Sequence, residues 1–148
     1  MDLTRKLTSD DHDAALALYR TLVGDQEIDT SKTRFATLLA HPGTALIGAD
    51  HAGTLSAMLT LHILPNITQN GRPYALIENV VTARPVRGRG LGRAVMSAAI
   101  QRAWDADAYK IMLLTGQDST TKGFYTALGF LDDQKHGLQL RRVPPRAP

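Results

Sequence analysis

Three glycines and three arginines lie within seven residues of this chain, and their chemistry is the most distinctive in the sequence. They are Arg87, Gly88, Arg89, Gly90, Gly92 and Arg93. Glycine permits positive φ and a close backbone approach, so successive N–H groups can point into one concavity. A helix is predicted to begin here, and its unpaired N–H groups and positive dipole end favour an anion. The turn is therefore predicted to bind a phosphate or pyrophosphate.

The glycine spacing excludes two common phosphate-binding motifs. A dinucleotide-binding turn needs a third glycine or alanine, but Arg93 or Val95 stands there in the two possible frames. A P-loop ends in Gly-Lys followed by Ser or Thr, a combination that the chain lacks. The pattern that the chain does contain is R-x-x-G-x-G, from Arg87 to Gly92. The alternative to a phosphate-binding turn is an ordinary glycine-rich turn whose arginines face water.

A strand and a helix are predicted to position this turn. Residues 75–81 are mostly apolar and contain several β-branched side chains, which is typical of a buried strand. Pro85 ends the strand, because proline has no N–H to donate to a neighbouring strand. Beyond the turn, apolar residues at every fourth position give the helix one apolar face. They are Leu91, Val95, Ala99 and Ala103.

The N-terminal half is predicted to contain two helices and an antiparallel pair of strands. The elements are a strand at 3–7, a helix capped by 8–11 and ended by Gly24, a polar stretch at 25–30, a helix from about Ser31 to His41, and strands at 44–49 and 53–62. In the last strand, alternating residues predict one packed face and one more polar face. The apolar set is Leu55, Ala57, Leu59 and Leu61, and the polar set is Thr54, Ser56, Thr60 and His62.

The C-terminal part is predicted to complete a mixed sheet. The apolar run 111–114 favours a strand covered on both faces and parallel to 75–81 through a right-handed crossover. A helix at 122–128 and a closing hairpin of 130–132 with 136–142 follow. The expected order is β-α-α-β-β-β-α-β-α-β-β, an α/β fold with a mostly antiparallel sheet. We expect one domain over 1–142 and a short flexible tail at 143–148.

Composition narrows the class of protein further. No run approaches the ~18 apolar residues that span a bilayer, and the N-terminus lacks the apolar segment of a secretory signal. The absence of cysteine excludes disulfides and a thiolate nucleophile. The histidines show no metal-ligand spacing, and a net charge of +3 is low for a nucleic-acid binder. We expect a cytoplasmic protein with no metal, membrane or nucleic-acid partner.

Two segments carry a family resemblance. The R-x-x-G-x-G turn, after a strand ending in Val-Val-Thr, resembles the acetyl-CoA pyrophosphate loop of the GNAT superfamily of N-acetyltransferases. Residues 123–130, Gly-Phe-Tyr-Thr-Ala-Leu-Gly-Phe, resemble the F-Y-x-x-x-G-F segment of the same family. The order of elements is similar too, over most of the chain and least in residues 20–45. The resemblance implies a GNAT fold, an amine acceptor and acetyl-CoA as donor.

The resemblance also implies where the cofactor binds. Backbone groups near Val80 and Val81 would hold the pantetheine arm. The pyrophosphate would be held by N–H groups of Arg87, Gly88, Gly90, Gly92 and Arg93. The arginine side chains of the turn either contact the cofactor or face water. Family members often carry Asn before the F-Y helix, where this chain has Asp118 and Thr121, so a contact there is left open.

Acyl transfer to an amine needs a base for the ammonium, and Glu78 is the candidate. It interrupts an apolar strand on the face of Leu76 and Val80, and burial would raise its pKa from ~4.3 towards neutral pH. Glucosamine-phosphate acetyltransferases have a similar I-E-D-V-V segment with Glu at this position. The alternative is a glutamate that pairs with arginine or faces water.

Tyr125 is the candidate acid for the departing thiolate. A phenol with pKa ~10 can protonate a thiolate whose thiol has pKa ~8.5, and Tyr125 stands within the F-Y-x-x-x-G-F segment. The alternative is a core tyrosine, because Phe124, Leu128 and Phe130 are predicted to be core. A backbone N–H near Val80 would stabilise the oxyanion. Without cysteine, direct attack within a ternary complex is the simpler route.

No motif identifies the acceptor amine. Side chains that could reach the cleft are His62, Asn66, Arg72, Tyr74 and Asn79. We expect a small polar primary amine such as an amino sugar, an aminophosphonate or an amino acid. The alternatives are a lysine or N-terminus of a protein, a non-catalytic acyl-CoA sensor, and a nucleic-acid-binding domain. Family members are commonly dimers, so a homodimer is expected.

Overall fold

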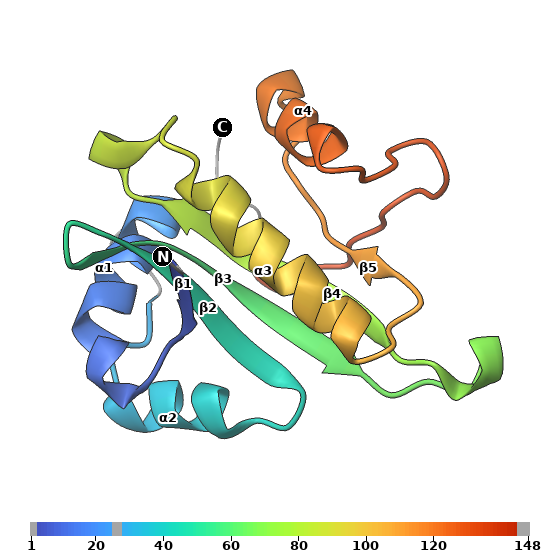
Figure 1. Ribbon diagram of the computed structural model, residues 1–148, viewed down its shortest axis with the longest axis horizontal. Helices are drawn as coiled ribbons and strands as arrows, with labels where there is room; N and C mark the ends of the chain where they lie inside the picture. Colours follow the sequence, from blue (N-terminus) through green and yellow to red (C-terminus); the bar gives the residue numbers. More distant parts are fainter. Residues whose placement is uncertain (1–2, 25–27, 145–148) are drawn as a thin grey trace. The chain divides into compact units, whose positions relative to one another are not determined.

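The computed structural model describes residues 3–24 and 28–144 (Figure 1). They belong to two compact units, 1–113 and 114–148, and each unit is described by itself. The predicted polar stretch at 25–30 and the predicted tail at 143–148 lie partly outside the described residues. The single domain expected over 1–142 stays a prediction.

The first unit is built on a five-stranded sheet in the order β1-β2-β3-β4-β5. The strands are β1 (Thr4–Lys6), β2 (Thr44–His51), β3 (Thr54–Leu64), β4 (Tyr74–Thr82) and β5 (Ile111–Met112). The first four strands pair antiparallel, whereas β5 runs parallel to β4. This mixed sheet, with helices between its strands, confirms the predicted fold class.

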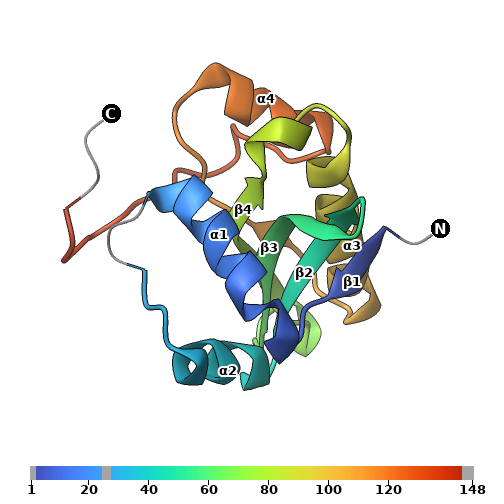
Figure 2. The same ribbon diagram turned by 90° about the vertical axis from the view of Figure 1, so that its left-hand side faces the viewer.

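Helices cover both faces of the sheet. α1 (His12–Val23) and α2 (Lys32–Ala40) lie on one face, and α3 (Leu91–Asp105) lies on the other (Figure 2). α3 buries Leu91, Val95, Met96, Ala99 and Ala103, which confirms its predicted apolar face. Short 3-10 turns are formed by Ser9–Asp11, Gln69–Gly71 and Arg84–Val86. Among the described residues, no helix is long and apolar enough to cross a membrane.

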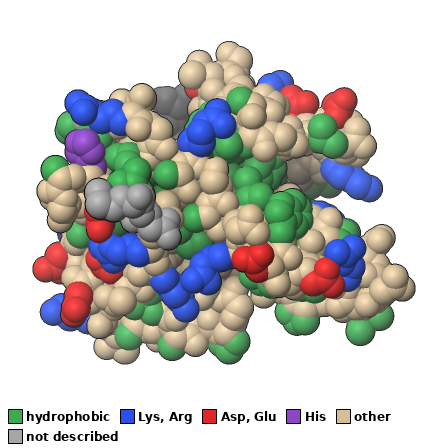
Figure 3. Space-filling view, in the orientation of Figure 1, with side chains coloured by type: hydrophobic (Ala, Val, Ile, Leu, Met, Phe, Trp, Pro, Cys, Tyr) green, Lys and Arg blue, Asp and Glu red, His purple; other side chains and the backbone are tan. Residues whose placement is uncertain are grey.

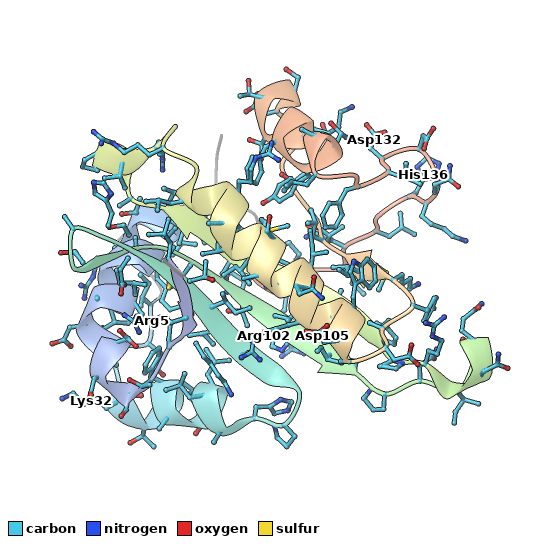
Figure 4. All side chains as sticks on the ribbon, viewed as in Figure 1. Arg5, Lys32, Arg102, Asp105, Asp132 and His136 are labelled. Carbon is cyan, nitrogen blue, oxygen red and sulfur yellow. The ribbon has the colours of Figure 1, made fainter. Side chains whose placement is uncertain are left out.

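An ion-pair network fixes the start of α1. Asp11 accepts a 2.8 Å hydrogen bond from the Thr8 N–H, as in a capping box. Arg5 on β1 (Figure 4) donates two hydrogen bonds to Asp11 and two to Asp50 at the end of β2. The hydrogen bonds from Arg5 lower the pKa of Asp11. This network ties the N-terminal strand to its neighbour and to the helix.

The polar face predicted for β3 is wrong. Ser56, Met58 and Thr60 are all buried, because α1 packs on this side of the sheet. The alternation also breaks at Ser56, where the register with β2 shifts. As a result, Leu55 joins Met58 in the core cluster beneath α1.

The second unit departs most from prediction. α4 (Ser119–Ala127) begins three residues before the predicted 122, because Asp118 caps it by accepting a hydrogen bond from the Thr120 N–H. No strand forms at 130–132 or 136–142, so the predicted closing hairpin is wrong. A two-stranded hairpin is marginal unless its apolar face is packed. The leucines that would form that face, Leu131, Leu138 and Leu140, are exposed.

The predicted strand at 111–114 is also corrected. Only Ile111 and Met112 form β5, they are half-buried, and Leu114 is exposed. The expectation of a strand covered on both faces is therefore wrong. Its parallel pairing with β4 is confirmed, with Ala75 opposite Ile111 and Leu76 opposite Met112.

Candidate functional site

A β-bulge interrupts β4 at the centre of the candidate site. Thr60 on β3 lies opposite Glu78 and Met58 lies opposite Val81, so Asn79 and Val80 together face a single residue of β3. Asn79 has φ +54°, in the left-handed region that asparagine adopts more readily than most residues. Bulges redirect side chains and often lie beside active sites.

Beyond Leu76, the outer edge of β4 pairs with no strand in the described part of the chain. β5 pairs only with Ala75 and Leu76, and no other described strand pairs with this edge of β4. An unpaired edge offers N–H and C=O groups to an extended ligand, which can add as a further strand. Val80 and Val81, the residues expected to hold the pantetheine arm, lie along this free stretch.

The glycine-rich turn presents a run of unpaired amides. Backbone hydrogen bonds stop at Arg87, whose N–H donates to the Arg84 carbonyl over 3.3 Å, and resume at Ala94, which donates to Gly90 over 2.9 Å. In the described part of the chain, the six N–H groups from 88 to 93 have no carbonyl acceptor, and no side chain caps α3. Gly88 and Gly90 have φ +78° and +86°, which other residues rarely adopt.

The arginines of the turn differ in their contacts. Arg87 donates a 3.1 Å hydrogen bond from Nε to the Thr82 carbonyl, so its guanidinium is held beside the end of β4. Arg89 and Arg93 are exposed and pair with no carboxylate among the residues described. On the face in Figure 3, basic and acidic side chains are interspersed rather than segregated.

Glu78 does not have the burial that the sequence suggested. Its side chain is exposed in the structure, so the burial expected from the sequence is absent. It lies beside the bulge, opposite Thr60 on β3. A role for Glu78 as base would therefore involve water rather than a buried carboxylate.

Tyr125 lies in the second unit, on α4. Its ring packs edge-on against Phe124 at 5.0 Å and Phe130 at 6.1 Å between centroids. Burial raises its pKa, so the phenol keeps its proton at neutral pH. The neighbouring apolar residues, including Leu128, are only half-buried and not the core that was predicted.

Asp118 and Thr121 both serve the cap of α4. The Asp118 carboxylate accepts from the Thr120 N–H at 3.3 Å and from the Thr121 hydroxyl at 3.1 Å. Both side chains thus have local partners.

No motif marks the pocket of about 520 Å³ that lies between α1, α2 and the sheet. Apolar side chains line it from the two helices: Leu16, Tyr19, Val23, Phe35 and Leu38. Polar side chains line it from the sheet and from the turn after α2: His41, Thr44, His62 and Asn79. The apolar residues come from the region between the first strand and the β2–β3 hairpin.

The pocket includes two of the five residues expected to reach a cleft, His62 and Asn79. The other three have partners elsewhere. Asn66 donates to the Thr68 hydroxyl at 2.9 Å, Arg72 pairs with Asp107 at 2.7 Å, and Tyr74 packs beneath the Lys110 ammonium at 5.9 Å.

Comparison with known proteins gives a consistent result. The acetyltransferase (GNAT) family matches residues 11–130. The chain is 33% identical over 89 residues to a glucosamine 6-phosphate N-acetyltransferase of Trypanosoma brucei brucei, a match covering 60% of this chain and 57% of that protein.

Solved structures match over nearly the whole chain. One from Agrobacterium tumefaciens strain C58, named as a candidate acetyltransferase, is 43% identical with a TM-score of 0.89, covering 94% of this chain and 99% of its own. A Trypanosoma brucei acetyltransferase is 26% identical with a TM-score of 0.80, covering 95% and 98%.

Proposed function

The chain belongs to the GNAT family of acetyltransferases, and on this premise we propose that it transfers the acetyl group of acetyl-CoA to the primary amine of a small molecule. The family match runs through both motifs, the glycine-rich turn and the F-Y-x-x-x-G-F segment. It confirms the acetyltransferase class that these motifs predicted. The donor's binding mode, the acceptor and the catalytic residues are proposals.

The observation that carries the proposal is the run of six unpaired amides at the start of α3. N–H groups at a helix N-terminus, with glycines at positive φ, form a site for a diphosphate. Arg87, held beside the end of β4, adds a positive charge at this site. The free edge of β4 leads away from the same turn and supports an extended pantetheine arm.

Direct attack within a ternary complex fits the residues available. The ammonium loses a proton to Glu78 through water, because that carboxylate is exposed. The amine nitrogen then attacks the thioester carbonyl, and a backbone N–H near Val80 stabilises the oxyanion. The C–S bond breaks as the tetrahedral intermediate collapses to the amide, and Tyr125 gives its proton to the departing thiolate. The nitrogen of the intermediate loses its extra proton through water, and this proton restores the Tyr125 phenol.

A small amine is the acceptor that we favour. The T. brucei brucei relative is named for glucosamine 6-phosphate, a primary amine on a small molecule. This chain spans only 57% of that relative, so the likeness supports the acceptor class and not the individual compound. A pocket of about 520 Å³ on the bulge side of the sheet has room for such a molecule. A homodimer and a cytoplasmic location stay predictions.

The test is thiol release from acetyl-CoA by the full chain with a panel of amines. The panel contains amino sugars, amino acids, arylalkylamines and a peptide with a lysine and a free N-terminus. We expect release with at least one small amine and amide formation by mass spectrometry. Acetylation of the peptide alone would indicate a protein acetyltransferase. Acetyl-CoA binding by calorimetry without turnover of any amine would indicate a sensor and overturn the proposal.

A further inference from the structure

The pocket between α1, α2 and the sheet has two chemically different surfaces. Its helical wall is mostly apolar, with Leu16 and Val23 from α1 and Leu38 from α2, although Arg34 and Thr37 of α2 also line it. Its floor on the sheet is polar, with Thr44 from β2 and His62 from β3. A small ligand in this pocket would therefore make apolar contacts on one side and hydrogen bonds on the other.

The polar floor is a chain of three side chains joined by hydrogen bonds. The Thr44 hydroxyl lies 2.9 Å from Nδ1 of His41 and 2.8 Å from Nδ1 of His62. Thr44 is 6% exposed and stands directly opposite His62 in the β2–β3 register. Gly43 at φ +75° packs against the Ile63 carbonyl, where a Cβ would not fit, and so holds His41 beside the sheet.

This arrangement fixes the donors and acceptors of the two imidazoles. The Thr44 hydroxyl has one hydrogen, so it donates to one Nδ1 and accepts from the other when both rings are neutral. The ring that donates from Nδ1 carries a lone pair on Nε2. Neither Nε2 has a partner among the described residues. The floor therefore offers one unused nitrogen that can accept a hydrogen bond from an ammonium.

The charges that line the pocket do not favour an anionic ligand. Of the side chains described there, Asp29 and Arg34 are the ones with permanent charge, and they approach within 3.5 Å of one another. A phosphate is normally bound by several cations or by free backbone amides. Arg34 already pairs with the Asp29 carboxylate, so the pocket wall favours a ligand that is uncharged apart from its ammonium.

We propose that the pocket binds a primary amine with an apolar, uncharged body, with the ammonium on the His41–Thr44–His62 floor and the body against α1 and α2. This inference rests on the proposed function and narrows its acceptor class. It departs from the polar amine expected from the sequence. It also separates this chain from a sugar-phosphate acceptor, which the apolar wall would desolvate without compensation.

The first experiment compares phenethylamine, glucosamine and glucosamine 6-phosphate by thiol release from acetyl-CoA. We expect kcat/KM for phenethylamine to exceed that for either sugar by about tenfold or more. Burial of its aromatic ring should stabilise the bound amine, relative to the amine in water, by at least about 1.5 kcal/mol. A higher kcat/KM for either sugar would overturn the inference and leave the acetyltransferase proposal intact. Calorimetry of phenethylamine with CoA-saturated protein separates the two claims. If phenethylamine binds but is not acetylated, the inference about the pocket holds and the proposed activity is refuted. If phenethylamine does not bind, the inference about the pocket is refuted.

Thr44 tests the floor as a positioning residue. Thr44→Val keeps the shape but removes the hydroxyl, so neither imidazole is held in a fixed tautomer. We expect KM for phenethylamine to rise about tenfold, the value of one hydrogen bond to a charged group, with kcat and the KM of acetyl-CoA little changed. Thr44→Ser restores the hydroxyl and should restore KM. Equal KM values in both variants and the wild type would overturn the role of the floor.

Leu38 tests the wall, and its neighbour provides a matched control. Both Leu38 and Leu39 lie on α2 and are half-buried against the core, but only Leu38 lines the pocket. Leu38→Gln should raise KM for phenethylamine several-fold more than Leu39→Gln. Equal effects of the two substitutions would show that the ring does not contact this wall, and would overturn the proposed orientation.

Discussion

Alanine at Gly90 is the substitution that tests the diphosphate site most directly. Gly90 caps α3 with φ +86° and ψ 1°, and an added Cβ would meet nothing within 4 Å. The cost to the unliganded protein is therefore conformational rather than steric. The left-handed conformation costs a non-glycine residue about 1–2 kcal/mol, and alanine recovers about 0.4–1 kcal/mol from the unfolded chain. We expect a net loss of about 1 kcal/mol, or about 2–4 °C in Tm.

The effect on cofactor binding should be larger. The open space beside Gly90 is where a diphosphate would approach the six free amides, so the Cβ would push the ligand away from at least one of them. One hydrogen bond to a charged group is worth about 1.5–3 kcal/mol, which corresponds to a Kd raised about 10- to 150-fold. Calorimetry with CoA measures this Kd, and thermal denaturation without ligand measures the stability.

Gly53 provides the control for Gly90. It has φ +78° with nothing within 4 Å of an added Cβ, and it lies in the turn between β2 and β3. Gly53→Ala should lose similar stability and leave the Kd for CoA unchanged. Equal Kd values for Gly90→Ala and the wild type would refute the diphosphate site. So would equal weakening of binding by both substitutions, because that would trace the effect to stability alone.

Three further predictions concern catalysis and folding. Tyr125→Phe should lower kcat for thiol release about 10²-fold or more if the phenol is the general acid, with the Kd for acetyl-CoA unchanged by calorimetry; an unchanged kcat would remove the assignment. Glu78→Gln should flatten the rise of kcat/KM with pH, and an unaltered pH–rate profile would mean that another base or bulk water takes the proton. Asp11 has a pKa lowered by Arg5, so its contribution to the free energy of unfolding is present above the unfolded pKa of about 3.9. That contribution is lost as pH falls through the lower folded pKa. At pH 7, Asp11→Asn should already be about 2 kcal/mol less stable than the wild type. In urea denaturation, the free energy of unfolding of the variant should therefore fall less between pH 7 and pH 3 than that of the wild type.

The strand, turn and helix around residues 75–105 could be predicted because each depends on local chemistry. The strand ends at Thr82, before the 3-10 turn that contains Pro85, and Gly88 and Gly90 supply the positive φ that the glycine-rich turn needs. The apolar face of α3 follows from a period that tertiary packing did not disturb. The glycine-rich turn could therefore be predicted from residues that are close in sequence.

The predictions that failed depend on contacts between distant segments. The burial of Thr60 on β3 follows from α1 packing on that face, and the break at Ser56 follows from a register shift with β2. The hairpin predicted at 136–142 had the right alternation but lacks a surface that covers Leu138 and Leu140. The pocket combines residues from two helices and three strands, so no sequence spacing could reveal it.

The bulge at Asn79 lies between the pocket proposed for the acceptor and the edge of β4 proposed for the cofactor. Without it, strict alternation would place Glu78 and Val80 on one face of β4 and Asn79 on the other. The extra residue instead brings Asn79 into the pocket, and Val81 opposite Met58 in the core beneath α1. Val80, between them, belongs to a stretch that cannot keep regular pairing with β3, beside the free edge of β4. The left-handed conformation of Asn79 thus turns its side chain into the pocket, next to Val80, the proposed oxyanion donor, whereas a regular strand would turn that side chain to the opposite face.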